Sequence, residues 1–63
     1  MRYSANLKVG WSEIKILPRG RRLTFKSILL AERALERKAR HYEINSRGII
    51  TDTGGKIVLT IAL

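Results

Sequence analysis

A short basic stretch in the first half of the chain has the chemistry of a phosphate site. Arg19-Gly20-Arg21-Arg22 sets three arginines around a glycine, and Lys26 follows closely. Guanidinium groups bind phosphate oxygens through paired hydrogen bonds, and glycine lets the backbone approach a ligand. The stretch precedes a predicted helix, whose free N–H groups would add to the attraction for an anion. It lacks the further glycines and the Gly-Lys-Ser/Thr ending of a P-loop, and a solvated basic loop is the alternative interpretation.

A second basic group lies on the predicted helix and just beyond it: Arg37, Lys38, Arg40 and Arg47. Cations in such a stripe suit the phosphate backbone of a nucleic acid. Glu32 and Glu36 interrupt the helical part, so an ordinary solvated face is the alternative. The predicted nucleic-acid-binding residues are therefore Arg19, Arg21, Arg22, Lys26, Arg37, Lys38, Arg40 and Arg47.

The overall charge points the same way. The 63 residues include 13 Lys and Arg against five Asp and Glu, for a formal net charge of +8. Such an excess favours a polyanionic partner, and we expect a small regulatory or architectural protein that binds DNA or RNA. The alternative is a small protein–protein interaction module, an accessory subunit or inhibitor without enzymatic activity. The salt dependence of binding distinguishes the two, because only phosphate contacts release condensed counterions.

Residue types argue against catalysis and cofactors. The chain has no cysteine and one histidine, which excludes disulfides and a zinc site built from the usual ligands. Asp52-Thr53-Gly54 resembles the short motif of aspartic proteases, but Asp and Gly at this point are equally typical of a hairpin turn. We therefore expect no enzyme, no cofactor or metal, and no small-molecule substrate.

The cationic groups must be positioned by one helix, predicted over residues 24–44. Six apolar residues recur there at steps of three and four, which places them on one helix face: Phe25, Ile28, Ala31, Leu35, Ala39 and Tyr42. Thr24 or Ser27 is expected to cap its start. Asn45 or Gly48 is expected to end it in the left-handed conformation.

Strands are expected on both sides of the helix. In residues 5–17 the apolar positions switch from odd to even numbers near Gly10, which indicates either a bulge or a tight turn between two short strands. Residues 49–51 and 57–63 read as strands joined by a turn at 52–55. Trp11 is expected to pack in the core, with base stacking as the alternative.

These elements predict a single domain over residues 1–63 of the α+β class. One amphipathic helix packs on a small, mainly antiparallel sheet in the order β(β)αββ. The last strand is apolar on both faces, and one helix covers only one face of a sheet. We therefore expect a second copy of the protein on the other face, the alternative being a partly exposed face.

The first residues do not resemble a signal peptide, because Met1 to Ser4 lead into mixed polar sequence. No stretch approaches the roughly 20 apolar residues that span a bilayer. We expect a cytoplasmic protein that makes no membrane contact.

Overall fold

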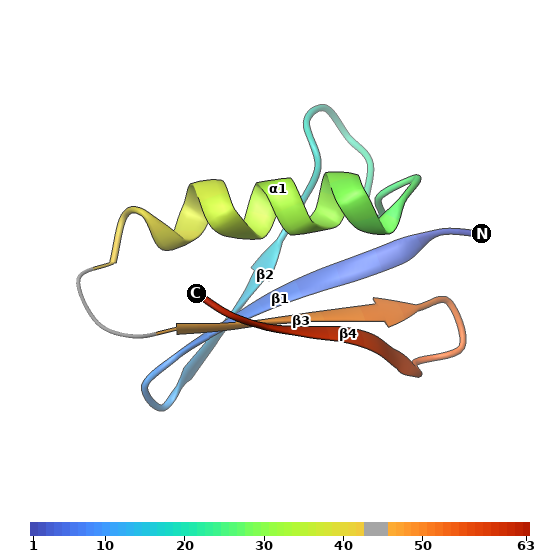
Figure 1. Ribbon diagram of the computed structural model, residues 1–63. Helices are drawn as coiled ribbons and strands as arrows, with labels where there is room; N and C mark the ends of the chain where they lie inside the picture. The colour runs from blue at the N-terminus through green and yellow to red at the C-terminus, as the bar shows by residue number, and fades with distance from the viewer. Residues whose placement is uncertain (43–45) are drawn as a thin grey trace.

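The computed structural model describes residues 1–42 and 46–63. Four strands form one antiparallel sheet in the order β2-β1-β3-β4, and a single helix lies between β2 and β3 in the chain. The elements are β1 (Tyr3–Val9), β2 (Ser12–Ile16), α1 (Ile28–Ala39), β3 (Ser46–Asp52) and β4 (Ile57–Ala62). Figure 1 shows α1 lying across one face of the sheet. The α+β prediction of one helix on a small antiparallel sheet is confirmed.

The switch from odd to even apolar positions is a tight hairpin between β1 and β2. Val9 pairs with Ser12, so Gly10 and Trp11 alone form the loop. Gly10 has φ 61°, whereas none of the described non-glycine residues has positive φ, which fits a type II′ turn with glycine at its first position. The two-residue loop puts Trp11 at the tip, fully exposed. The prediction of a core position for Trp11 is wrong, because a turn this short leaves its side chain nothing to pack against.

The helix begins four residues later than the sequence suggests. Ser27 is its N-cap, and the Ser27 hydroxyl accepts a hydrogen bond from the Leu30 N–H at 3.2 Å. The preceding segment is extended because Phe25 exchanges two backbone hydrogen bonds with Tyr3, at 2.9 and 2.7 Å. α1 ends at Ala39, so the helix predicted to residue 44 is wrong over residues 40–42; the predicted terminus at Asn45 lies outside the described residues.

The core lies between α1 and the two central strands. Its buried members come from the helix, from three of the strands and from the segment before the helix: Ala5, Leu7, Ile16, Phe25, Ala31, Leu35 and Ile50. Gly48 lies in β3 directly beneath Leu35, and a Cβ there would come 2.8 Å from Leu35 Cδ1. The prediction that Gly48 ends the helix is therefore wrong: this glycine allows the helix to pack closely on the sheet.

The predicted turn between the last two strands is confirmed. Asp52 Oδ1 accepts hydrogen bonds from the N–H groups of Gly54 at 2.9 Å and Lys56 at 3.0 Å, and Gly55 has φ 84°. An irregularity in pairing after Ile50 sets Ile57 opposite Thr51. Ile57 is consequently exposed, whereas Leu59 and Ile61 are half-buried against the core.

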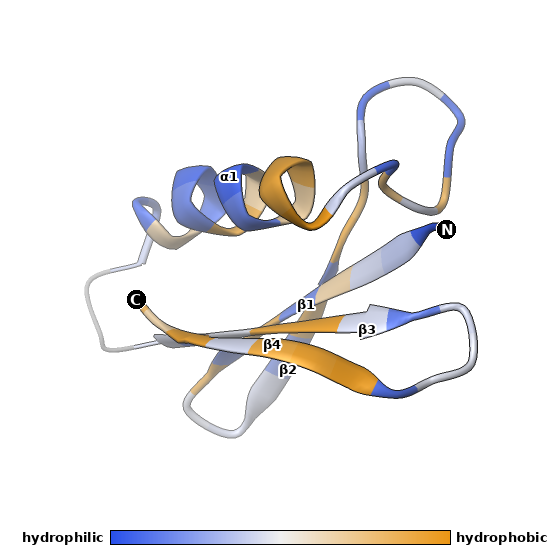
Figure 2. Ribbon diagram, turned by 45° about the vertical axis from the view of Figure 1, so that its right-hand side comes forward, coloured by the Kyte–Doolittle hydropathy of each residue, from blue (hydrophilic) through white to orange (hydrophobic). Residues whose placement is uncertain are grey.

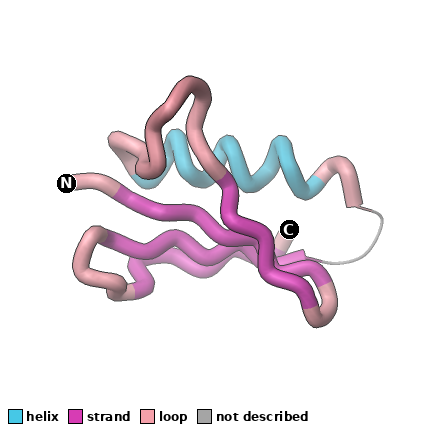
Figure 3. Tube along the Cα trace, turned by 180° about the vertical axis from the view of Figure 1, so that it is seen from behind, coloured by secondary structure: helices cyan, strands magenta, loops and turns pink. Residues whose placement is uncertain are grey.

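The face of the sheet opposite α1 is covered by no other element in the described part of the chain (Figure 3). α1 approaches β1, β2 and β3, and β4 lies beyond its reach. The length and polarity of α1 rule it out as a bilayer-spanning helix, and no other helix occurs among the described residues.

Candidate nucleic-acid interface

A groove of about 440 Å³ opens between one flank of α1 and the segment that leaves β2. Its floor is apolar, with Ile16 from the end of β2, Phe25 from the extended segment before α1, and Ala34 from the helix. The segment over residues 17–25 protrudes from the sheet edge and runs up beside α1 before the helix begins (Figures 1 and 3). The groove therefore has two walls of different origin, one a loop and the other a helix.

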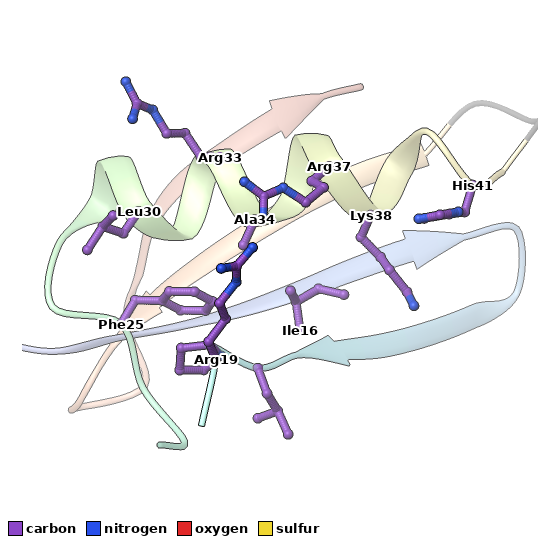
Figure 4. Close-up of a pocket in the computed structure, with 11 residues that line it drawn as sticks. Ile16, Arg19, Phe25, Leu30, Arg33, Ala34, Arg37, Lys38 and His41 are labelled. Atoms are coloured by element: carbon purple, nitrogen blue, oxygen red, sulfur yellow. The ribbon is translucent and has the colours of Figure 1, made fainter. Parts of the chain in front are cut away.

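Cationic side chains stand on both walls of this groove. The loop contributes Arg19, and the helix contributes Arg33, Arg37 and Lys38; His41, from the turn after the helix, also lines the groove. In Figure 4 the Arg19 guanidinium extends toward that of Arg37, across the apolar floor. None of the described residues that line the groove is acidic. Like charges gathered this way repel one another and favour an anion between them.

The helical repeat explains why Glu32 and Glu36 do not line the helix wall of the groove. The lining residues of α1 and its C-terminal turn recur at steps of three, one, three, one and three, which define one flank of a helix: Leu30, Arg33, Ala34, Arg37, Lys38 and His41. Glu36 lines a separate shallow hollow beside Arg40, and Glu32 is half-buried outside the groove. Glu32 and Glu36 therefore lie outside the groove lining, although Glu36 neighbours Arg33 and Arg37, which line both the groove and the hollow.

The structure brings together three of the predicted site residues and leaves the others apart. Arg19, Arg37 and Lys38 line the groove, while Arg40 lies in the neighbouring hollow with Arg33 and Arg37. Arg21, Arg22 and Lys26 are exposed on the segment before the helix, outside the groove lining. Arg47 lies in β3 beside Lys8 and does not extend the helical group.

Two lining residues were missed by the sequence prediction. Arg33 and His41 line the groove but are not among the predicted binding residues. Both lie on the same flank as Arg37 and Lys38, since Arg33 precedes Arg37 by four residues and His41 follows it by four. That spacing was a signal present in the sequence.

One arginine of the loop, Arg19, lies in the groove beside α1 rather than only at the start of the helix. At the start of the helix, the Ser27 hydroxyl accepts a hydrogen bond from the Leu30 N–H, one of the donors that the helix itself leaves free. In the loop, Gly20 follows Arg19 with φ 81°, and Arg19 lines the groove together with Ala34, Arg37 and Lys38 of the helix. The cationic side chains of the groove therefore come from two walls, the loop and the helix.

No family model, no curated protein and no solved structure matches this chain.

Proposed function

We propose that the protein binds nucleic acid, DNA or RNA, mainly through phosphate contacts made by the groove between α1 and the loop before it. The observation that supports this best is the placement of Arg19 opposite Arg37 and Lys38, without an acidic residue among the described lining groups. Arginine forks pair with phosphate oxygens more tightly than point charges do. Cationic side chains on the two walls can contact a nucleic-acid phosphate backbone from both sides of the groove, which suits a protein that binds mainly through phosphate contacts.

A polymer suits this surface better than a small anion. Further cations continue on either side of the groove, with Arg21 and Arg22 on the loop and Arg40 on the exposed helix face. They lie outside the lining, where a single phosphate in the groove would not reach them. A chain of phosphates would contact the groove and these flanking groups together, and each contact would release counterions.

A second candidate function is the binding of an acidic amphipathic protein segment. Two exposed leucines, Leu17 and Leu30, line the groove. Apolar anchors in a groove with a basic rim suit a helix that carries acidic residues along its edges. For such a partner the apolar floor supplies most of the affinity, and the cations select the partner.

The test compares two triple variants of equal charge. Arg19, Arg37 and Lys38 are replaced by alanine in the first, and Arg21, Arg22 and Arg40 in the second, so both change the net charge from +8 to +5. Labelled single-stranded DNA, duplex DNA and RNA are titrated at two salt concentrations. We expect affinity to fall steeply with salt, and the groove variant to lose at least about 1 kcal/mol more than the flanking variant.

Each other outcome has a defined meaning. Equal losses in the two variants would indicate a diffuse charge effect and remove the groove as the site. Absence of nucleic-acid binding by the unmodified protein at low salt would overturn the proposal. Binding of an acidic amphipathic peptide that is lost in Leu30→Ser and depends weakly on salt would establish the second candidate.

A further inference from the structure

The two edges of the sheet differ in a way that bears on assembly. β2 forms one edge and β4 the other. The β2 edge carries two exposed charges, Glu13 and Lys15, and Pro18 follows it. Charges and proline are the usual protection of an edge strand against pairing with another chain. β4 reads Ile-Val-Leu-Thr-Ile-Ala and contains neither. The irregularity in its pairing lies at the Ile57 end, so the edge over residues 59–62 is regular and unprotected.

The apolar content of β4 exceeds what the monomer buries. Leu59 and Ile61 are only half-buried on the helix side, and α1 does not reach this strand. Ile57 and Val58 are exposed, at 57% and 36%. Figure 2 shows β4 as a largely hydrophobic strand at the border of the sheet. A short chain without disulfides is expected to use such surface elsewhere.

The backbone of β4 offers the matching hydrogen-bonding groups. The Leu63 N–H donates to the Ser46 carbonyl at 2.9 Å. Because bonding alternates along an antiparallel ladder, Leu59 and Ile61 also point their backbone groups toward β3. The N–H and C=O groups of Thr60 and Ala62 therefore point outward, along an edge that a further strand would complete.

We propose that β4 pairs antiparallel with β4 of a second copy of this protein, forming a continuous eight-stranded sheet. In this chain, only β4 itself presents an uncharged apolar edge among the described strands. The groove with its cations lies beside β2, at the opposite edge of the sheet. β4 itself contains no charged residue, so two copies of charge +8 would meet along strands that add no like-charge contact of their own, with Lys56 and Arg47 beside the seam.

The length of β4 defines the register. With the two-fold axis at Thr60, near the middle of β4, the outward-pointing backbone groups of Thr60 face those of its own copy. Val58 then lies opposite Ala62, and Leu59 opposite Ile61, which pairs apolar residues on both faces. An antiparallel pair of this kind keeps both helices on the same side of the sheet. Both grooves therefore open at the two outer edges of one surface.

Sedimentation velocity over a range of protein concentrations tests the pairing. We expect a dimer in the unmodified protein and at least about tenfold weaker dimerisation in Thr60→Lys, because two lysines would lie directly opposite one another. Ser12→Lys is the matched control, since it adds the same charge to an exposed residue on the β2 edge. It should dimerise as the unmodified protein does. Higher salt should strengthen the dimer by screening repulsion, opposite to its effect on nucleic-acid binding.

A cysteine variant tests the register without disturbing the fold. The chain has no cysteine, so Thr60→Cys introduces the sole thiol. Hydrogen-bonded partners in an antiparallel pair have Cα atoms about 5.5 Å apart, within disulfide range. Oxidation should give a covalent dimer for Thr60→Cys and little for Ser12→Cys. A monomer at all concentrations would overturn the proposal, as would a dimer that keeps full affinity in Thr60→Lys and forms no disulfide in Thr60→Cys.

Discussion

Leu35 of α1 packs directly onto Gly48 of β3, and this contact sets the distance between helix and sheet. A Cβ on residue 48 would lie 2.8 Å from Leu35 Cδ1 and 3.3 Å from Leu63 Cδ1. Leu35 is fully buried, so its side chain cannot move aside into solvent. The same helix carries the cationic wall of the groove on its outer flank, so the seating of Leu35 also positions Arg37 and Lys38.

Gly48→Ala is expected to destabilise the protein by about 1 to 3 kcal/mol, the usual cost of adding a methyl group to a filled core. Urea denaturation followed by circular dichroism measures the change. Leu35→Val removes the Cδ atoms that the new methyl group would meet. The double variant should therefore be more stable than the sum of the two single changes predicts. Additive losses would show that the two residues are not coupled.

Leu35→Asp is expected to abolish cooperative folding, because it places an unpaired carboxylate in the core. Leu29→Asp is the matched control: it makes the same chemical change in the same helix at an exposed position. Thermal denaturation should show a cooperative transition for Leu29→Asp and none for Leu35→Asp. A folded Leu35→Asp variant would contradict the assignment of the buried helix face.

Periodicity predicted the helix and its buried face, and long-range pairing decided where it begins. Phe25 belongs to the apolar repeat of the helix, yet its backbone pairs with Tyr3 and the segment is extended. Local pattern contains no information about such a partner. The hairpin at Gly10 was one of two alternatives, and backbone geometry selects it. The prediction for Trp11 was wrong because residue type suggests burial, whereas the two-residue turn leaves no room for it.

The groove was predictable in part. The basic character of Arg19, Arg37 and Lys38 was evident from the sequence, and so was the helical spacing that aligns Arg33 with Arg37. The meeting of loop and helix was not, because it depends on the path of residues 17–25. That path is fixed by the Tyr3–Phe25 pairing and by the Arg2 side chain, which donates to the Thr24 hydroxyl at 2.6 Å.

Asp52→Ala is expected to loosen the turn between β3 and β4. Its carboxylate accepts hydrogen bonds from the N–H groups of Gly54 and Lys56, and loss of both should lower the free energy of unfolding by about 1 to 3 kcal/mol. Asp52→Asn keeps a side-chain oxygen acceptor and should lose less. Amide hydrogen exchange at Gly54 and Lys56 reports the turn directly. Unchanged protection of both amides in Asp52→Ala would show that the side chain does not hold the turn.

Trp11 is expected to contribute to binding rather than to stability. It stands fully exposed at the tip of the β1–β2 hairpin, next to a hollow lined by Lys8 and Arg47. An exposed indole beside cations can stack on an unpaired base while the cations contact phosphate. This expectation depends on the proposed nucleic-acid binding.

If Trp11 stacks on a base, Trp11→Ala should weaken binding of single-stranded DNA or RNA by about 1 to 3 kcal/mol. Duplex binding should change little, because paired bases are not available for stacking. The urea midpoint should stay close to that of the unmodified protein, since the side chain packs on nothing. Trp11→Phe, which keeps an aromatic face, should recover part of the affinity. Trp11 is the sole tryptophan, so its fluorescence reports the contact directly. Saturating single strands should quench it, and equal quenching by duplex, or none by either, would exclude stacking at this residue.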